Sequence, residues 1–212
     1  MGVVARLCAL WLISVYRPWC REYGVLVEIL RTTPMPHLST HLGVALVAAE
    51  DHRFWRHAGI DLWAIGRAIV RTVALRKLEG ASTIEQQLIR VTSRRYEITL
   101  SRKIREMAFA VALGAFFKKE EVLILYLVCG YYGWCMSGLT AACRGLGIHP
   151  TLATTTDAAK LVARLRYPEP AYGSSSHRER IDRRVKHILS RASKPARLQG
   201  AHLSVPTDPA RS

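Results

Sequence analysis

Residues 44–61 read VALVAAEDHRFWRHAGID, and the architecture that we expect for the chain follows from this stretch. Its first residues are apolar, so the carboxylate of Glu50 that follows them should lie at the edge of a hydrophobic core. A carboxylate in that position can act as a general base when it is ionised and close to the proton that it removes. A pKa raised toward the working pH makes such a base effective. Taken alone, the pair Glu50 and Asp51 is more typical of the charged end of a surface helix.

Helical spacing dominates most of the chain. Apolar side chains recur on one helical face over residues 65–73, with basic side chains largely elsewhere. Similar patterns predict helices over 101–117, 156–166 and 178–191. The first half of the apolar run Val122 to Met136 is also expected to be helical. Because no alternating strand pattern appears, the sequence predicts a mainly α fold.

Two local patterns make more detailed predictions. The sequence Ser82-Thr83-Ile84-Glu85 has the form of a capping box, in which the serine and the glutamate satisfy the first amides of a helix. Gly80 marks the turn before that helix. The helix expected over 101–117 should bury Ile104, Ala108, Val111 and Ala115.

The charge of the chain restricts its partners. It carries 31 Lys and Arg against 16 Asp and Glu, a net charge of +15. Such a charge implies an anionic partner, namely nucleic acid, acidic lipid headgroups or a phosphorylated substrate. Half of the residues are apolar, which fits contact with a membrane better than a nucleic-acid-binding domain. A length of 212 residues suits one full core.

The chain begins with an apolar run from Leu7 to Tyr16, flanked by arginines. A bilayer-spanning helix needs about 20 apolar residues, so this run is too short to span on its own. A signal-type segment, an interfacial anchor and the remnant of a longer transmembrane helix are the three interpretations. We expect four parts: a membrane anchor or truncated transmembrane segment over 1–21, a connector with two prolines over 22–39, the main domain over 40–192 and a disordered tail over 193–212.

Three motifs follow one another in the chain: EDHRFWRHAGID at 50–61, GASTIEQQ at 80–87 and SRKIRE at 101–106. Together they resemble the motifs of the family 51 glycosyltransferases, the peptidoglycan transglycosylases that occur alone or fused to penicillin-binding domains. The resemblance covers about residues 40–191 and implies a lysozyme-like helical transglycosylase domain. The matched positions are Glu50, Asp51, Phe54, His57, Gly59 and Asp61 in the first motif, Gly80, Ser82, Thr83, Ile84, Gln86 and Gln87 in the second, and Arg102, Lys103 and Glu106 in the third.

The resemblance also implies roles for these residues. Glu50 is the expected catalytic base, and Glu106 is the expected second carboxylate, which positions cations or helps to hold a divalent cation, Mg²⁺ or Mn²⁺. The sequence itself shows no metal-ligand spacing and requires no cofactor. The residues expected to bind the substrate are Ser82, Gln86, Arg90, Arg102, Lys103 and Arg105. Structural roles within the motifs are expected for Asp51, Phe54, His57, Gly59, Asp61 and Gly80.

Some positions depart from the family pattern, including Ala81 and Glu85 in the second motif. Ile124 and Val128 stand where the fourth motif has a glutamate and an asparagine, so the change is either a compensated repacking or a loss of function. Ile98 stands where many relatives carry an arginine near the pyrophosphate. Arg94 and Arg95 lie close enough in the sequence to replace it.

The function implied by the resemblance is the polymerisation of lipid II, a disaccharide-pentapeptide on a polyprenyl pyrophosphate, into β-1,4 glycan. The expected location is the bacterial cytoplasmic membrane, with the catalytic domain on its periplasmic or outer side. The expected partners are lipid II, the growing glycan, the membrane surface and cell-wall synthesis proteins, with no nucleic acid. Because the acylating pattern S-x-x-K is absent, a monofunctional enzyme is expected.

Three alternatives remain open at this point. A catalytically impaired relative would bind lipid II or cell-wall partners without polymerising glycan. A hydrolase of lysozyme type would use two carboxylates to cleave a glycosidic bond. A basic nucleic-acid-binding protein would account for the charge but would leave the three motifs as coincidence.

Overall fold

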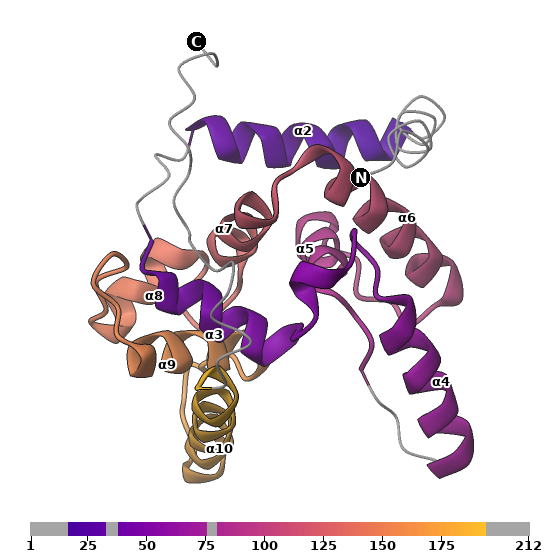
Figure 1. Ribbon diagram of the computed structural model, residues 1–212. Coiled ribbons are helices and arrows are strands. Elements are labelled where there is room, and N and C mark those ends of the chain that lie inside the picture. The colour runs from indigo at the N-terminus through magenta and orange to yellow at the C-terminus, as the bar shows by residue number, and fades with distance from the viewer. Residues whose placement is uncertain (1–16, 33–37, 76–79, 194–212) are drawn as a thin grey trace. The chain divides into compact units, whose positions relative to one another are not determined.

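The computed structural model describes residues 17–32, 38–75 and 80–193, and these ranges are predominantly helical (Figure 1). The elements are α2 (Arg17–Thr32), α3 (Thr40–Glu50), the short 3-10 helix η1 (Phe54–Arg56), α4 (Leu62–Leu75), α5 (Ile84–Ser93), α6 (Leu100–Phe116), α7 (Lys119–Cys129), α8 (Leu139–Leu146), α9 (Thr155–Arg166) and α10 (Ser175–Ala192). Within these ranges extended pairing is limited to two isolated bridges. The expected mainly helical, lysozyme-like class of domain is confirmed.

The described chain forms two compact units. The first contains residues 17–28, 53–75 and 80–119, and the second contains residues 29–32, 38–52 and 120–193. The chain therefore passes from the second unit to the first between His52 and Arg53. The motif that begins at Glu50 contributes its first residues to one unit and the remainder to the other.

The second unit is built around α3, α9 and α10, which pack against one another (Figure 1). The residues of α3 from Leu42 to Ala48 are apolar or glycine, and all of them are buried. Its start is held by Ser39, whose amide donates to the Pro150 carbonyl at 2.9 Å and whose hydroxyl donates to the Ala153 carbonyl at 2.7 Å. These contacts fix the start of α3. The last residue of the helix, Glu50, lies at the rim of the core.

The helix α7 forms a further part of the core of the second unit. Residues 122–127 are all buried, and the prediction that the first half of this apolar run is helical is confirmed. Ile124 is fully buried, whereas Val128 is half-buried near the end of the helix. Tyr132 follows the helix and donates its hydroxyl to the Leu127 carbonyl at 2.7 Å. Burial raises the pKa of Tyr132 well above its ordinary value.

The first unit contains α4, α5 and α6, of which α5 and α6 pack together. The predicted buried face of α6 is wrong, since Ile104 is 59% exposed and Ala108, Val111 and Ala115 are only half-buried. The buried residues of α6 are instead Glu106, Phe109, Ala110, Ala112 and Leu113. A carboxylate stands at the start of this buried stripe, and a search for apolar periodicity cannot assign a charged residue to the inside.

The predicted division of the N-terminal residues into an anchor and a connector stays a prediction. The helix α2 runs through the boundary predicted at residues 21 and 22, with Pro18 in its first turn, where proline is tolerated. Its residue Leu26 is fully buried. Residues 1–16, which hold most of the predicted anchor, and 194–212, which hold the predicted tail, lie outside the described residues. Among the helices that are described, none has the length and apolar character needed to cross a bilayer.

Gly59 lies so close to the backbone of α6 that no side chain fits at this position. Its φ angle is +97°, and a Cβ atom built on it would lie 2.1 Å from the carbonyl oxygen of Ala110 on α6. The segment that carries the first motif therefore approaches the backbone of α6 directly. The same approach brings Ala58 to Gly114 one turn further along α6, where an added Cβ would lie 3.1 Å from the Ala58 carbonyl carbon.

We expect Gly59→Ala to lower the free energy of unfolding by about 3 kcal/mol, because it combines backbone strain with a steric clash. The measurement is the midpoint of unfolding in urea. Gly66→Ala is the matched control, since a Cβ at Gly66 in α4 meets nothing within 4 Å. Alanine there should be neutral or stabilising by up to about 1 kcal/mol. Equal effects of the two substitutions would contradict the close approach to α6.

Candidate active site

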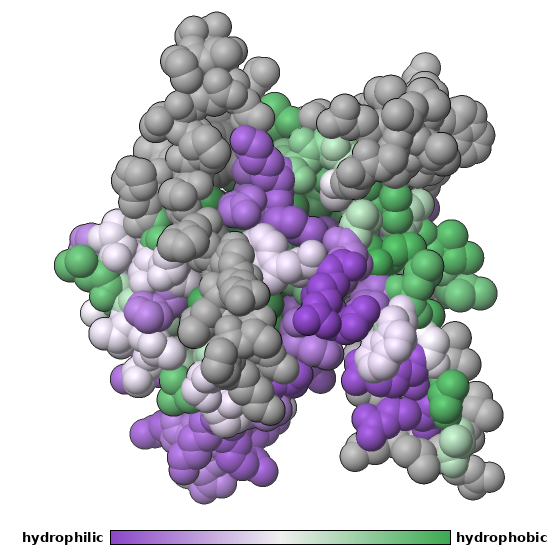
Figure 2. All heavy atoms as spheres, viewed as in Figure 1, coloured by the Kyte–Doolittle hydropathy of each residue, from purple (hydrophilic) through white to green (hydrophobic). Residues whose placement is uncertain are grey.

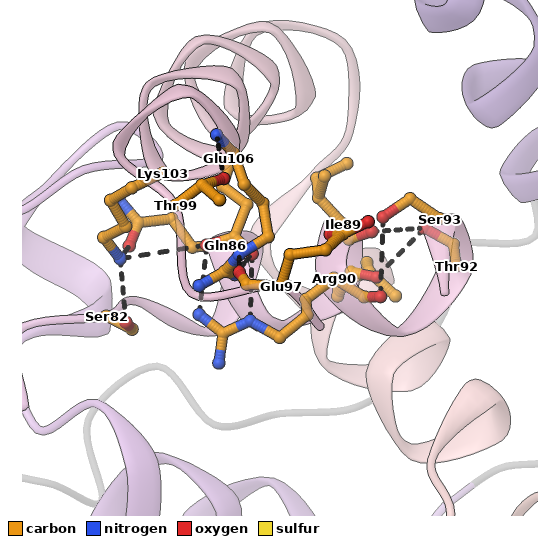
Figure 3. A network of polar contacts seen from close by, with 12 residues as sticks. Ser82, Gln86, Ile89, Arg90, Thr92, Ser93, Glu97, Thr99, Lys103 and Glu106 are labelled. Atoms are coloured by element: carbon orange, nitrogen blue, oxygen red, sulfur yellow. Dashed lines mark hydrogen bonds and ion pairs between the residues drawn. The ribbon is translucent and has the colours of Figure 1, made fainter. Parts of the chain in front are cut away.

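A network of polar contacts surrounds the carboxylate of Glu106, which is only 2% exposed (Figure 3). The Arg90 guanidinium binds it in a bidentate manner, with Nε 2.9 Å from Oε1 and Nη2 3.0 Å from Oε2. Arg102 donates a further hydrogen bond to Oε1, and the Lys103 ammonium lies 3.9 Å from Oε2. One buried negative charge thus holds three positive charges, which leaves an excess of positive charge.

The packing of two helices explains this convergence. Arg102 and Lys103 precede Glu106 by one turn of α6, and Arg90 comes from the last turn of α5. Thr99 caps α6 by accepting from the Arg102 amide at 3.2 Å. The Arg102 side chain also donates to the Glu97 carbonyl, so the backbone before α6 helps to hold its guanidinium.

Lys103 connects this network to the second motif. Its ammonium donates to the Ser82 hydroxyl at 2.9 Å and to the Gln86 side-chain carbonyl at 2.8 Å (Figure 3). Burial lowers the pKa of Lys103, the neighbouring arginines lower it further, and Glu106 opposes the change. The ammonium is therefore in a positive and partly desolvated environment, which an anion beside it would relieve.

Gln86 supplies an unsatisfied donor within the same network. The residue is fully buried, and the part of the chain that the structure describes offers no hydrogen-bond partner to its Nε2. Its Oε1 is occupied by Lys103. A buried N–H without an acceptor is costly, so an incoming oxygen acceptor would be favoured there.

The capping box predicted at residues 82–85 is wrong, because Ser82 and Glu85 do not cap the helix. Thr83, not Ser82, caps α5 by accepting from the Gln86 amide at 3.3 Å, and it also donates to the Gly59 carbonyl at 2.6 Å. Glu85 does not turn back to the helix start but is buried beside Lys119, whose ammonium lies 2.5 Å from its Oε1. The second bond of Thr83 explains why it is the cap, and Ser82 is left to contact Lys103.

Lys119 joins Glu85 to the first motif. Its ammonium lies 4.1 Å from the centre of the Phe54 ring, which is fully buried and packs edge-on against Trp55 and His57. A cation over an aromatic face is stabilised by the ring quadrupole, and more so when it is desolvated. The start of α5, the start of α7 and the first motif therefore share one buried charge pair.

We expect Lys119→Met to lower the free energy of unfolding by about 3 kcal/mol, because it leaves Glu85 buried without its cation. Adding Glu85→Gln should recover part of this loss, and a double-mutant cycle in urea measures the coupling. The control is Lys118→Met at the neighbouring exposed lysine, which should cost less than about 0.5 kcal/mol. Additive effects at residues 85 and 119 would show that the pair is not coupled.

Glu50 ends α3 in the second unit, and its side chain is 13% exposed. Arg184 of α10 donates from Nη2 to Glu50 Oε1 at 2.8 Å and to the Ala49 carbonyl at 2.9 Å. The expectation that Glu50 lies at the edge of the core is confirmed. Asp51 is buried and ends the helix through its amide, which donates to the Val47 carbonyl at 3.1 Å.

Arg184 is the residue of this site that the sequence analysis missed. It lies on α10 between the buried residues Ile181 and Ile188, at spacings of three and four residues. A cation placed inside an apolar helical stripe is the signal that could have found it, since a solvated arginine has no reason to occur there.

Asp61 closes the first motif as the cap of α4. Its Oδ1 accepts from the Ala64 amide at 3.1 Å, and its Oδ2 accepts from Arg53 Nε at 2.7 Å. Burial alone would raise the pKa of Asp61, but the bonds from Ala64 and Arg53 together lower it below its ordinary value of 3.8. The charged carboxylate is therefore favoured in the folded state.

Because its folded-state pKa is depressed, Asp61 stabilises the protein above pH 3.8, and this contribution is lost as the pH falls through the folded-state pKa. Asp61→Asn keeps a capping oxygen but removes the charge. We expect the variant to be less stable by about 1 kcal/mol at neutral pH and equal to the wild type in acid. Urea unfolding at a series of pH values measures the difference. A difference that persists in acid would assign it to packing, and Asp182→Asn on the surface of α10 is the control.

Some expected positions lie apart from the network. Arg105 is half-buried on α6, but the hydrogen bonds to Glu106 come from Arg90 and Arg102. Gly80 is exposed, and a Cβ there would meet nothing within 4 Å, so nothing in the structure explains a glycine at this position. Arg94, Arg95 and Ile98 lie in the exposed connection between α5 and α6, with Ile98 98% exposed.

These features define a helical domain of a recognisable enzyme class. One unit holds a carboxylate at a helix end against an arginine, and the other gathers three cations around a buried glutamate. The transglycosylase family model matches residues 26–193, and the chain belongs to that family. The resemblance to family 51 glycosyltransferases is thereby confirmed, and the match begins earlier than the expected boundary at residue 40.

The relatives of the chain carry the same kind of domain within longer proteins. The chain is 38% identical over 180 residues to penicillin-binding protein 1A of Aquifex aeolicus (strain VF5), covering 84% of this chain and 25% of that protein. It is 30% identical over 183 residues to penicillin-binding protein 1A of Neisseria lactamica, covering 84% and 21%. A match to penicillin-binding protein 1F of Bacillus subtilis (strain 168) is 39% identical over 99 residues, covering 46% and 14%. The chain thus spans a quarter or less of each of these relatives.

Proposed function

We propose that the chain is a peptidoglycan glycosyltransferase that polymerises lipid II into β-1,4 glycan strands and releases polyprenyl pyrophosphate. Membership of the transglycosylase family supports the reaction class. The observation that carries the proposal is the gathering of Arg90, Arg102 and Lys103 around the buried Glu106. A neutral glycan cleaved by a hydrolase would not require such a concentration of positive charge, whereas a pyrophosphate does.

The cation network acts at the leaving group in this proposal. When the bond between the donor sugar and the pyrophosphate breaks, negative charge develops on the pyrophosphate oxygens. Donors that are already fixed in place stabilise this charge without reorganisation. Lys103 and the two arginines supply the charge, and the unsatisfied Gln86 Nε2 supplies a neutral donor.

The contacts of Glu106 do not fit the divalent cation that the family resemblance suggests. Both of its oxygens accept hydrogen bonds from guanidinium groups, and Lys103 lies close to one of them. Mg²⁺ and Mn²⁺ prefer anionic oxygen ligands that are not already neutralised by fixed cations. In the proposed mechanism Arg90, Arg102 and Lys103 therefore neutralise the charge of the pyrophosphate, and no metal ion takes part at Glu106.

Glu50 acts at the acceptor in this proposal. Its carboxylate removes the proton from the 4-hydroxyl of the acceptor sugar, and that oxygen attacks the donor anomeric carbon with inversion. The bond to the pyrophosphate breaks as the new glycosidic bond forms. Arg184 orients the carboxylate through the 2.8 Å contact to Oε1. This contact supports the assignment, because a general base has to be held within reach of the proton that it removes.

The location belongs to the proposal as well. A lipid-linked substrate requires the enzyme to work at a membrane surface, here the bacterial cytoplasmic membrane on its periplasmic or outer side. The net charge of +15 favours anionic headgroups at that surface. Lipid II and the growing glycan are the proposed substrates, and other cell-wall synthesis proteins are proposed partners.

The test is polymerisation of labelled lipid II by the purified full chain in detergent, with glycan length resolved on a gel. Glu50→Gln keeps the shape of the side chain but removes the base, so the rate should fall at least about 100-fold. Glu179→Gln, at an exposed carboxylate of α10, is the matched control and should polymerise like the wild type. Unfolding curves of all three proteins establish that the variants are folded.

Two results would overturn the proposal. A folded Glu50→Gln variant that polymerises at the wild-type rate would remove Glu50 from the mechanism. A folded wild type that binds lipid II but forms no glycan would favour the catalytically impaired relative. Attention would then turn to Ile124 and Val128, the two apolar replacements in α7.

A further inference from the structure

One face of α10 carries a row of basic side chains that the proposed reaction does not use in full. The row, here called the α10 stripe, consists of Arg180, Arg184, His187 and Arg191. Their spacings of four, three and four residues place them on one helical face. From first to last the row extends about 16 Å along the helix axis. Figure 2 shows the surface of α10 as strongly hydrophilic.

The packing of α10 fixes the orientation of this stripe. Ile181, Ile188 and Ala192 are buried, and the helix packs against α3 and α9. The stripe lies beside that apolar face, and the two acidic residues of the helix, Glu179 and Asp182, lie on other faces. The acidic residues of α10 therefore do not interrupt the row, whose charge comes from Arg180, Arg184 and Arg191.

The side chains of the stripe are held by neighbouring groups. Arg184 contacts Glu50 at 2.8 Å, so an inner member of the stripe lies beside the proposed catalytic base. The Arg180 guanidinium lies 5.8 Å from the centre of the Tyr167 ring, and Arg191 Nη1 lies 3.3 Å from His187 Nε2. Positioned guanidinium groups bind carboxylates with good geometry and a reduced entropic cost.

We propose that the α10 stripe binds the carboxylates of the peptide carried by the acceptor disaccharide whose 4-hydroxyl is delivered to Glu50. This inference rests on the proposed function, in which the substrate is a disaccharide-pentapeptide. Every such peptide ends in a carboxylate unless it is amidated. A disaccharide with its 4-hydroxyl at Glu50 would carry its peptide on the second sugar, one sugar away from Arg184, and the arginines one and two turns along the helix would receive the negative charge.

The composition of α10 favours this ligand over a lipid surface. A helix that lies in a membrane interface inserts an apolar face into the lipid. In α10, which is described throughout, the large apolar residues Ile181 and Ile188 are buried and none is strongly exposed. The exposed surface thus offers charge without an inserting group.

The test measures binding to the full chain of a soluble, fluorescent disaccharide-pentapeptide that lacks the lipid and pyrophosphate. The stripe variant is Arg180→Gln with Arg191→Gln, and the control is Arg178→Gln with Lys186→Gln, which removes the same charge from exposed positions on other faces. We expect the stripe variant to bind roughly tenfold more weakly at low salt and the control less than twofold more weakly. A probe with amidated carboxylates should bind weakly to all three proteins.

Several outcomes would overturn the proposal that the α10 stripe binds peptide carboxylates. Equal losses in both double variants would indicate attraction to net charge alone, and tight binding of the amidated probe would exclude carboxylate recognition. A stripe variant that binds the probe normally but loses binding to vesicles of anionic phospholipid would assign the stripe to the membrane. The binding measurement does not depend on catalysis. If a chain that forms no glycan still binds the probe through the stripe, the proposed function is wrong and the proposed binding role of the stripe is supported.

Discussion

The burial of the Glu106 carboxylate is the constraint on which the arrangement of the first unit depends. A carboxylate that is 2% exposed is costly unless cations and hydrogen bonds compensate it, and here Arg90 and Arg102 bind it directly. This requirement holds α5 and α6 in one register and draws in Lys103. Lys103 in turn contacts Ser82 and Gln86, so a single buried negative charge organises the network of Arg90, Arg102 and Lys103.

A second layer of contacts holds the start of α5 in place. Thr83 caps the helix and bonds to Gly59, whose backbone lies directly against Ala110 of α6. Glu85 is tied to Lys119 at the start of α7. Since residues 83 and 85 lie between Ser82 and Gln86, which contact Lys103, these contacts limit the movement of Gln86. The residues that hold the network in place therefore lie outside it. A substitution among them would affect the site by displacing its side chains.

The sequence allowed more of the fold than of the site to be predicted. Apolar periodicity located α4, α6, α9 and α10, because burial of one face determines where a helix forms. It failed on the inward face of α6, where charge neutralisation buries Glu106. The local pattern at 82–85 also failed to identify its cap, because a bond to Gly59, distant in sequence, selects Thr83 over Ser82. Arg184 escaped notice because nothing local links residue 184 to Glu50.

The departures from the family pattern act on the packing in opposite ways. Glu85 places a charge in the core, and Lys119 neutralises one of its oxygens at 2.5 Å. Ile124 removes a polar group from α7 and is fully buried among apolar residues from Val122 to Leu127. An isoleucine in such surroundings leaves no donor or acceptor unsatisfied, whereas a buried polar side chain that lost its partner would. Ile124 is thus accommodated where it occurs. Glu85 is accommodated only in part, because its buried Oε2 has no hydrogen-bond partner among the described residues.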